Sequence, residues 1–166
     1  MPMCDQRHGF TPIETLVFVA IVVVLGAVVF VTVDPLSRFR TARDSRRSAD
    51  INAVLSAIKA SQIESGFLLP AVSKLVAGSV YMIGTGSAGC DDQNVVCDTA
   101  VTSDASCIDL SSLVSGGLLG SVPVSPDGSG NWTAAVTGYT LSRSADGTLT
   151  VRACESENAS EISASR

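Results

Sequence analysis

The sequence predicts an α+β protein, in which one long N-terminal α-helix packs its second half on a small antiparallel β-sheet head. Three observations support this fold class. Residues 15–33 carry no charge, residues 51–63 place apolar side chains on one side of a helix, and the segments 138–143 and 148–153 flank a hairpin turn. The 166 residues suffice for one domain with an extension.

The uncharged run at residues 15–33 matches the thickness of a membrane. As a helix it would span about 28 Å, close to the roughly 30 Å of a hydrocarbon core. It is longer than the apolar core of a cleaved signal peptide, and no small-residue cleavage site follows it. We interpret it as an uncleaved membrane helix. The alternative, a buried core helix, would need a larger partner domain than this chain offers.

Helix signals bracket this run. Thr11 suits an N-cap, Pro12 suits the first helical position, and Glu14 would place a carboxylate near the positive end of the helix dipole. We predict that Pro35 kinks or loosens the helix and that Gly26 weakens it further up.

The segment 35–65 predicts an amphipathic continuation of the helix. It begins with a basic collar made of Arg38, Arg40, Arg43, Arg46 and Arg47. An apolar stripe follows, made of Ile51, Val54, Leu55, Ile58 and Ile63. Gly66 suits a helix stop, and Pro70 prevents the helix from resuming.

The remaining residues predict a small β-rich head. Turn residues at 144–147 between two alternating segments indicate a hairpin. The other elements expected are a strand at 79–83, a short helix within 108–119, a strand at 132–136 and a fraying polar tail at 155–166.

Four of the five cysteines fall in this head, whereas Cys4 precedes the apolar run. Four cysteines in about 100 residues indicate two disulfides and an oxidising exterior. Of three possible pairings we favour Cys90–Cys97, which closes a short loop, with Cys107–Cys154. A zinc site is the alternative, but the chain has no Cys-x-x-Cys pair and no nearby histidine.

Composition disfavours two functional classes. The single histidine is His8, and no nucleophile–base spacing is evident, so we expect no enzymatic activity. The net charge is −5, and residues 66–166 alone carry four basic and ten acidic side chains. Binding of nucleic acid through this head is therefore not expected.

Several weaker patterns have ordinary structural explanations. The oxygen-rich stretch beginning at Asp127 resembles the start of a calcium loop, but a turn leading into a strand is the default. The acidic residues around Cys90 and Cys97 suggest a solvated loop. We interpret the glycosylation sequons at Asn131 and Asn158 as chance matches. Trp132 and Tyr139 could form part of the core or an adhesive spot on the surface.

The residues ahead of the apolar run, His8-Gly9-Phe10-Thr11-Pro12-Ile13-Glu14, form an unusual constellation. A carboxylate next to a membrane segment is costly unless it finds a partner. Cleavage after Gly9 would give Phe10 a new α-amino group, four residues before Glu14. That cation could pair with Glu14 of the same chain or of a neighbour, which would fix the register of an assembly.

This pattern resembles the type IV pilin and pseudopilin superfamily, whose members carry a short basic leader ending in Gly, then Phe, a short run, Glu and about twenty apolar residues. The match is close over residues 7–34 and loose over the rest. Pro12 departs from the pattern, since many members have Leu there. The resemblance implies a type IV pilin-like fold divided into a leader at 1–9, an apolar helix at 10–34, an amphipathic helix at 35–65 and a disulfide-stapled head at 66–166.

The same resemblance implies a mechanism of assembly. A prepilin peptidase would cut between Gly9 and Phe10, Phe10 would be N-methylated, and Glu14 would guide insertion into a filament at an inner-membrane assembly platform. The precursor would cross the membrane lipid once with its head outside. The finished subunit would then lie in an extracellular homopolymer or mixed filament, with roles in adhesion, motility, secretion or uptake.

Alternatives remain open at this stage. The positive-inside rule would place the basic collar in the cytoplasm, whereas the resemblance places it outside. The collar could pair with acids of neighbouring subunits or form a solvated helix face. The chain could also be a pseudopilin of a type II secretion or DNA-uptake system, or an anchored exterior binding domain that never polymerises.

Overall fold

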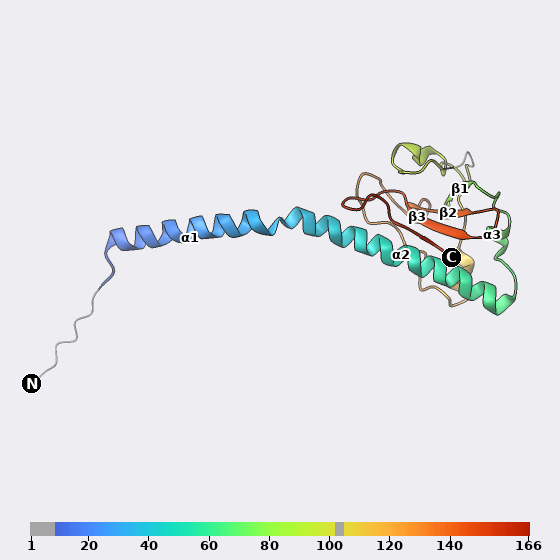
Figure 1. Cartoon of the computed structure of the whole chain (residues 1–166), viewed down its shortest axis with the longest axis horizontal. Coiled ribbons are helices and arrows are strands. Elements are labelled where there is room, and N and C mark those ends of the chain that lie inside the picture. The colour runs from blue at the N-terminus through green and yellow to red at the C-terminus, as the bar shows by residue number, and fades with distance from the viewer. Residues whose placement is uncertain (1–8, 102–104) are drawn as a thin grey trace, which may run out of the picture. The chain divides into compact units, whose positions relative to one another are not determined.

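The structure is a computed structural model that describes residues 9–101 and 105–166 (Figure 1). It is an α+β protein, as predicted, and it divides into two compact units at residues 38 and 39. Its elements in chain order are α1 (Pro12–Val33), α2 (Pro35–Ser65), α3 (Pro70–Ser73), β1 (Val80–Met82), the 3₁₀ turn η1 (Asp92–Val95), α4 (Ser111–Ser115), β2 (Tyr139–Arg143), β3 (Leu149–Ala153) and β4 (Ser163–Ser165).

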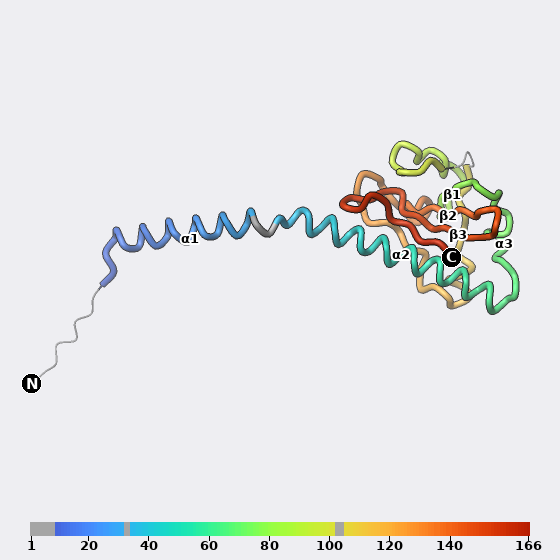
Figure 2. The backbone as a smooth tube through the Cα atoms, viewed as in Figure 1, coloured from blue at the N-terminus to red at the C-terminus, as the bar shows by residue number. Residues whose placement is uncertain are grey.

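The long helix is interrupted at Asp34, whose backbone adopts a left-handed conformation with φ 38° and ψ 73°. Pro35 explains the position, because a proline disfavours helical geometry in the residue before it. The Asp34 carboxylate accepts a hydrogen bond from the Ser37 amide at 3.4 Å, so the same residue caps α2. The helix α1 runs through Gly26 without a break (Figure 2).

One face of α2 is buried, as its apolar spacing predicts. The buried residues are Asp44, Arg47, Ile51, Val54, Leu55, Ala57 and Ile58. The predicted inclusion of Ile63 is wrong, since its side chain is 82% exposed. Five residues separate it from Ile58, which turns it about 140° away from the covered face. The helix ends before Gly66, which has φ +73°.

The head contains a four-stranded antiparallel sheet in the order β1-β2-β3-β4. The predicted hairpin is β2–β3, and Gly147 with φ +89° makes its turn possible. One sheet face packs on α2 through Tyr81, Tyr139, Leu141, Leu149, Val151 and Ala153. The predicted strand at 79–83 and the short helix within 108–119 appear as β1 and α4.

A second, smaller core lies around the disulfides, where Met82, Val101 and Trp132 are buried. The bridges are Cys90–Cys107 and Cys97–Cys154, so the pairing favoured from the sequence is wrong.

Backbone hydrogen bonds explain the observed pairing. The amide of Cys90 bonds to Ala105 and that of Cys107 to Gly86, while the Asp98 amide bonds to the carbonyl of Cys154. These contacts bring together cysteines that are distant in sequence.

Two further expectations fail. Residues 132–136 form a loop rather than a strand, because the amides of Thr85 and Gly86 bond to the carbonyls of Ala134 and Ala135 at a crossing point. At Gly84, a Cβ atom would lie 2.1 Å from the Ala135 oxygen, which shows how close the two backbones are. The tail does not fray, since β4 pairs with β3 and completes the sheet.

Candidate functional site

The first turn of α1 is built by residues 11–15. The Thr11 hydroxyl and carbonyl both accept hydrogen bonds from the Glu14 amide, at 3.4 and 3.0 Å. Pro12 occupies the first helical position, where its missing N–H is not needed. Glu14 therefore stands in the first turn, where the helix dipole favours a negative charge. The predicted cap is confirmed.

Aromatic side chains flank Glu14. Phe10, Thr15 and Phe18 line a shallow recess together with this carboxylate. Phe10 is 78% exposed and lies before the helix begins, as does Gly9. The Gly9–Phe10 peptide bond thus lies in an exposed, non-helical stretch. Residues 1–8 of the predicted leader, including Cys4 and His8, lie outside the described residues.

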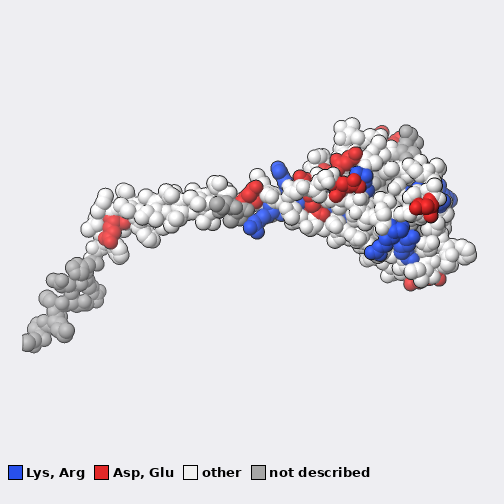
Figure 3. Space-filling view, in the orientation of Figure 1, with Lys and Arg blue, Asp and Glu red and all other residues white. Residues whose placement is uncertain are grey.

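The surface of α1 is apolar all round and uncovered. Its large apolar side chains from Ile13 to Val31 are between 48% and 78% exposed. Figure 3 shows this stretch as uncharged between its two ends. Full burial of one such side chain stabilises by about 1.5–3 kcal/mol relative to full exposure. Because these fourteen side chains are on average about 60% exposed, covering them would gain about 13–26 kcal/mol, which equals or exceeds the whole stability of an ordinary domain.

Such a surface requires an apolar environment. The helix is long and apolar enough to cross a membrane by length and composition. Its 22 residues span about 33 Å, which covers the hydrocarbon core of a bilayer. Packing against other apolar helices would satisfy the same requirement.

A buried ion cluster ties α2 to the C-terminal segment of the head. The side chain of Arg47 is fully buried and contacts three carboxylates: Asp44 at 2.9 Å, Glu157 at 3.0 Å and Glu155 at 3.3 Å. It also donates to the Ser125 hydroxyl and the Pro126 carbonyl. All five donors of a guanidinium point in fixed directions, so the cluster specifies one arrangement of these segments.

Two more groups complete this cluster. Arg43 pairs with both oxygens of Glu157. Its hydrogen bonds are the main reason that the pKa of Glu157 falls to about 2. Burial alone would raise the pKa of Asp44, but the amides of residues 157–159 and the Arg47 guanidinium outweigh it, and the pKa is lowered.

The basic collar is thus largely engaged within its own chain. Besides Arg43 and Arg47, Arg46 lies 3.9 Å from Asp50, although its side chain is 65% exposed. Asp50 also accepts a hydrogen bond of 2.6 Å from the Tyr139 hydroxyl. The pKa of Tyr139 is raised mainly because its hydroxyl is buried, and further because it donates to the Asp50 carboxylate.

The loop beginning at Asp127 is built around an internal carboxylate. Glu155 accepts hydrogen bonds from the amides of Ser129 and Gly130, and from the Trp132 indole at 2.7 Å. These amides direct their positive ends inward, which suits an anion and opposes a cation. The loop therefore has the polarity of a carboxylate-binding turn rather than of a calcium loop. Trp132 is a core residue, as is Tyr139.

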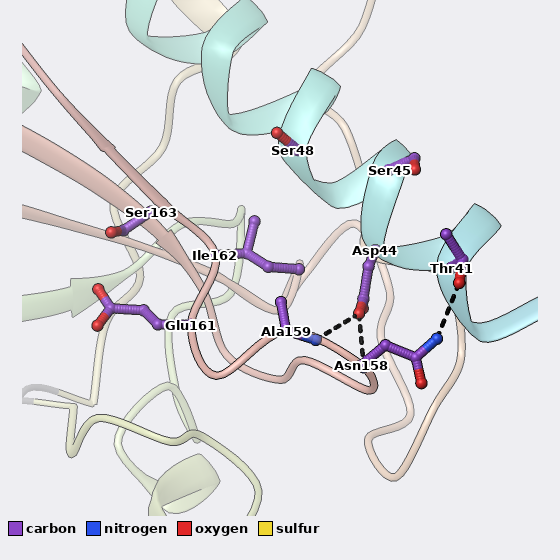
Figure 4. Close-up of a pocket in the computed structure, with 9 residues that line it drawn as sticks. All are labelled: Thr41, Asp44, Ser45, Ser48, Asn158, Ala159, Glu161, Ile162 and Ser163. Atoms are coloured by element: carbon purple, nitrogen blue, oxygen red, sulfur yellow. Dashed lines mark hydrogen bonds between the residues drawn. The ribbon is translucent and has the colours of Figure 1, made fainter. Parts of the chain in front are cut away.

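A groove of about 450 Å³ runs between α2 and residues 158–163 (Figure 4). The Asn158 side-chain amide donates to the Thr41 hydroxyl at 2.9 Å across one end. Both carboxylates of the groove already have partners. Asp44 accepts hydrogen bonds from backbone amides and pairs with Arg47, and Glu161 pairs with Arg152 at 3.0 Å. Hydroxyl groups of Ser45, Ser48 and Ser163 make up much of the remaining lining.

Comparisons with protein-family models, curated proteins and solved structures gave no match.

Sequence reasoning missed the ion cluster, although a signal was present. Arg47 lies four residues before Ile51 on the apolar stripe, so helical spacing alone places it on the buried face. A buried arginine demands carboxylates, and the tail offers Glu155 and Glu157. The sequence does not show that this tail lies against α2, because that depends on contacts between segments more than a hundred residues apart.

Proposed function

We propose that the chain is a structural subunit of a type IV pilus-like filament. Before assembly α1 would hold the chain in a cytoplasmic membrane, with the head outside. After removal of residues 1–9, the same helix would pack in the filament core. The observation that carries this proposal is an apolar helix, exposed on all sides, with one carboxylate in its first turn.

The position of Glu14 supports assembly rather than simple anchoring. A membrane anchor gains nothing from a carboxylate at this depth, because the charge opposes insertion. Cleavage after Gly9 would create an ammonium group on Phe10, four residues earlier. In an apolar helical bundle an ammonium of one subunit and a carboxylate of the next attract strongly. Their pairing would set the axial register of the subunits.

The exposure of the Gly9–Phe10 bond supports processing. A peptidase needs an extended substrate, and residues 9–10 are neither helical nor covered. By resemblance to the family, a prepilin peptidase would cut this bond and Phe10 would be N-methylated. Pro12 lies inside the first turn and leaves the bond uncovered.

The head supports an exterior location. Its two disulfides are typical of an oxidising compartment. The ion cluster around Arg47 fixes the C-terminal segment to α2, so that a load on the head would be transmitted to the helix. A pseudopilin of a secretion or uptake system would share all of these features and is the second candidate.

Removal of the Glu14 carboxylate tests the proposal. In native cells, the chain with Glu14→Ala should be processed and retained in membranes but absent from the sheared filament fraction. Glu64→Ala, which removes an exposed carboxylate near the end of α2, serves as the matched control and should leave filaments unchanged. Normal filaments from the Glu14→Ala chain would refute the assembly mechanism and favour an anchored binding domain.

A further inference from the structure

The buried face of α2 continues beyond the part that the head covers. Arg47, Asp44, Arg40 and Leu36 follow one another at intervals of three and four residues, so they share one side of the helix. The head covers this side from Asp44 onward. Leu36 is 67% exposed.

Phe39 and Arg40 lie at the uncovered end of this face. The Phe39 side chain flanks the face and is 64% exposed. Arg40 lies at the centre of this face and is exposed, and its guanidinium makes no ion pair or hydrogen bond within residues 9–101 and 105–166. An exposed phenylalanine beside an unpaired arginine provides both apolar area and charge for a partner.

Charge is distributed unevenly along the chain. Residues 38–47 contain five arginines and one aspartate, whereas residues 48–166 contain five basic and twelve acidic side chains. Arg43 and Arg47 already bind acids of their own head, so the exposed arginines, Arg40 among them, carry the charge that can meet the acidic head of a second copy in a head-to-tail contact. Contacts of this kind do not close on themselves and therefore generate open polymers.

We infer that Phe39 and Arg40 form a docking surface for the acidic head of a second copy of this chain. The inference rests on the proposed filament. The chain's own head provides the pattern, because Arg43 and Arg47 on the same helix already bind Glu155 and Glu157. A second head would extend this contact by one turn, with Phe39 covered by apolar atoms and Arg40 paired with a carboxylate.

A photo-crosslinking amino acid at position 39 of the full chain, expressed in native cells, tests the inference. Irradiated filaments should contain a covalent dimer in which residue 39 is joined to residues 66–166 of another copy. The matched control is the same probe at Ile63, which is 82% exposed on α2 but lies off the stripe. It should give little dimer. Adducts of residue 39 with lipid alone would assign this surface to the membrane and overturn the inference.

A charge reversal provides the second readout. An exposed ion pair changes an equilibrium constant by up to about fivefold. Arg40→Glu should lower the yield of crosslinked dimer by about this factor, and Arg46→Glu should leave it unchanged. An unaltered yield with Arg40→Glu would overturn the inference. If wild-type filaments form without any crosslink at position 39, the inference alone fails, whereas the absence of wild-type filaments would remove the proposed function as well.

Discussion

Replacing Arg47 by methionine removes the cation at the centre of the ion cluster while keeping a side chain of similar length. The guanidinium is fully buried and lies within 3.3 Å of three carboxylates. Removal of one partner from a buried ion cluster costs about 3–5 kcal/mol, because the remaining charges stay desolvated and repel one another. Since an ordinary domain is stable by about 5–15 kcal/mol, this loss should be severe.

Trp132 makes the loss measurable. It is the only tryptophan in the chain, and its indole donates to Glu155 within the cluster. Unfolding of the full chain by guanidinium in non-ionic detergent would be followed by its fluorescence and by circular dichroism. Arg46→Met is the matched control, and should cost less than about 1 kcal/mol because Arg46 is 65% exposed. A loss below about 1 kcal/mol for Arg47→Met would refute the stabilising role of the cluster.

Three further predictions concern the head. The pKa of Glu157 is lowered to about 2, so its contribution to stability is complete above about pH 4.5 and is lost as the pH falls toward 2; the same unfolding assay should show this decline, and Glu157→Gln should flatten it. Replacing the Cys97–Cys154 bridge by alanines frees a 57-residue loop and should cost about 4 kcal/mol, against about 3 kcal/mol for the 17-residue bridge, and equal losses would contradict the loop-entropy argument. Gly138→Ala should lower the thermal stability more than Gly147→Ala. Both glycines have positive φ, but only at Gly138 would the added Cβ meet the Trp132 ring, at 2.5 Å; equal losses of stability would show that the ring can move aside at little cost.

The helical part of the fold could be predicted because its signals are local. Thr11 and Pro12 determine the start of α1 through hydrogen bonds within one turn. Gly66 ends α2 through its own backbone conformation. The hairpin around Gly147 is equally local, since its turn and register depend on adjacent residues. None of these predictions required knowledge of distant contacts.

Apart from Ile63, whose exposure follows from helical spacing, the failures involve distant contacts. The disulfide pairing follows from contacts between distant residues, such as the bonds of the Cys90 amide to Ala105 and of the Cys107 amide to Gly86, and these cannot be read from sequence spacing. The polarity of the tail predicts fraying, but Glu155 and Glu157 are held by Arg47, more than a hundred residues earlier. A buried arginine on an apolar stripe was the one available sign of this contact.

In the candidate site, too, the local features could be predicted from the sequence and the distant contacts could not. The apolar run and the cap beside Glu14 are readable in the sequence, and the structure adds that the helix is uncovered. The sequence is compatible with two roles for the collar, a solvated helix face or contacts with neighbouring subunits. Arg43 and Arg47 bind the chain's own head, whereas Arg40 and Phe39 stay exposed.

The most direct test of the proposed filament is the mature N-terminus of the chain. Protein sheared from native cells would be sedimented, and its intact mass and N-terminal peptide would be measured by mass spectrometry. The proposal predicts a sedimentable fraction in which the chain begins at N-methylated Phe10. A chain that still begins at or near Met1 and remains confined to membranes would contradict it.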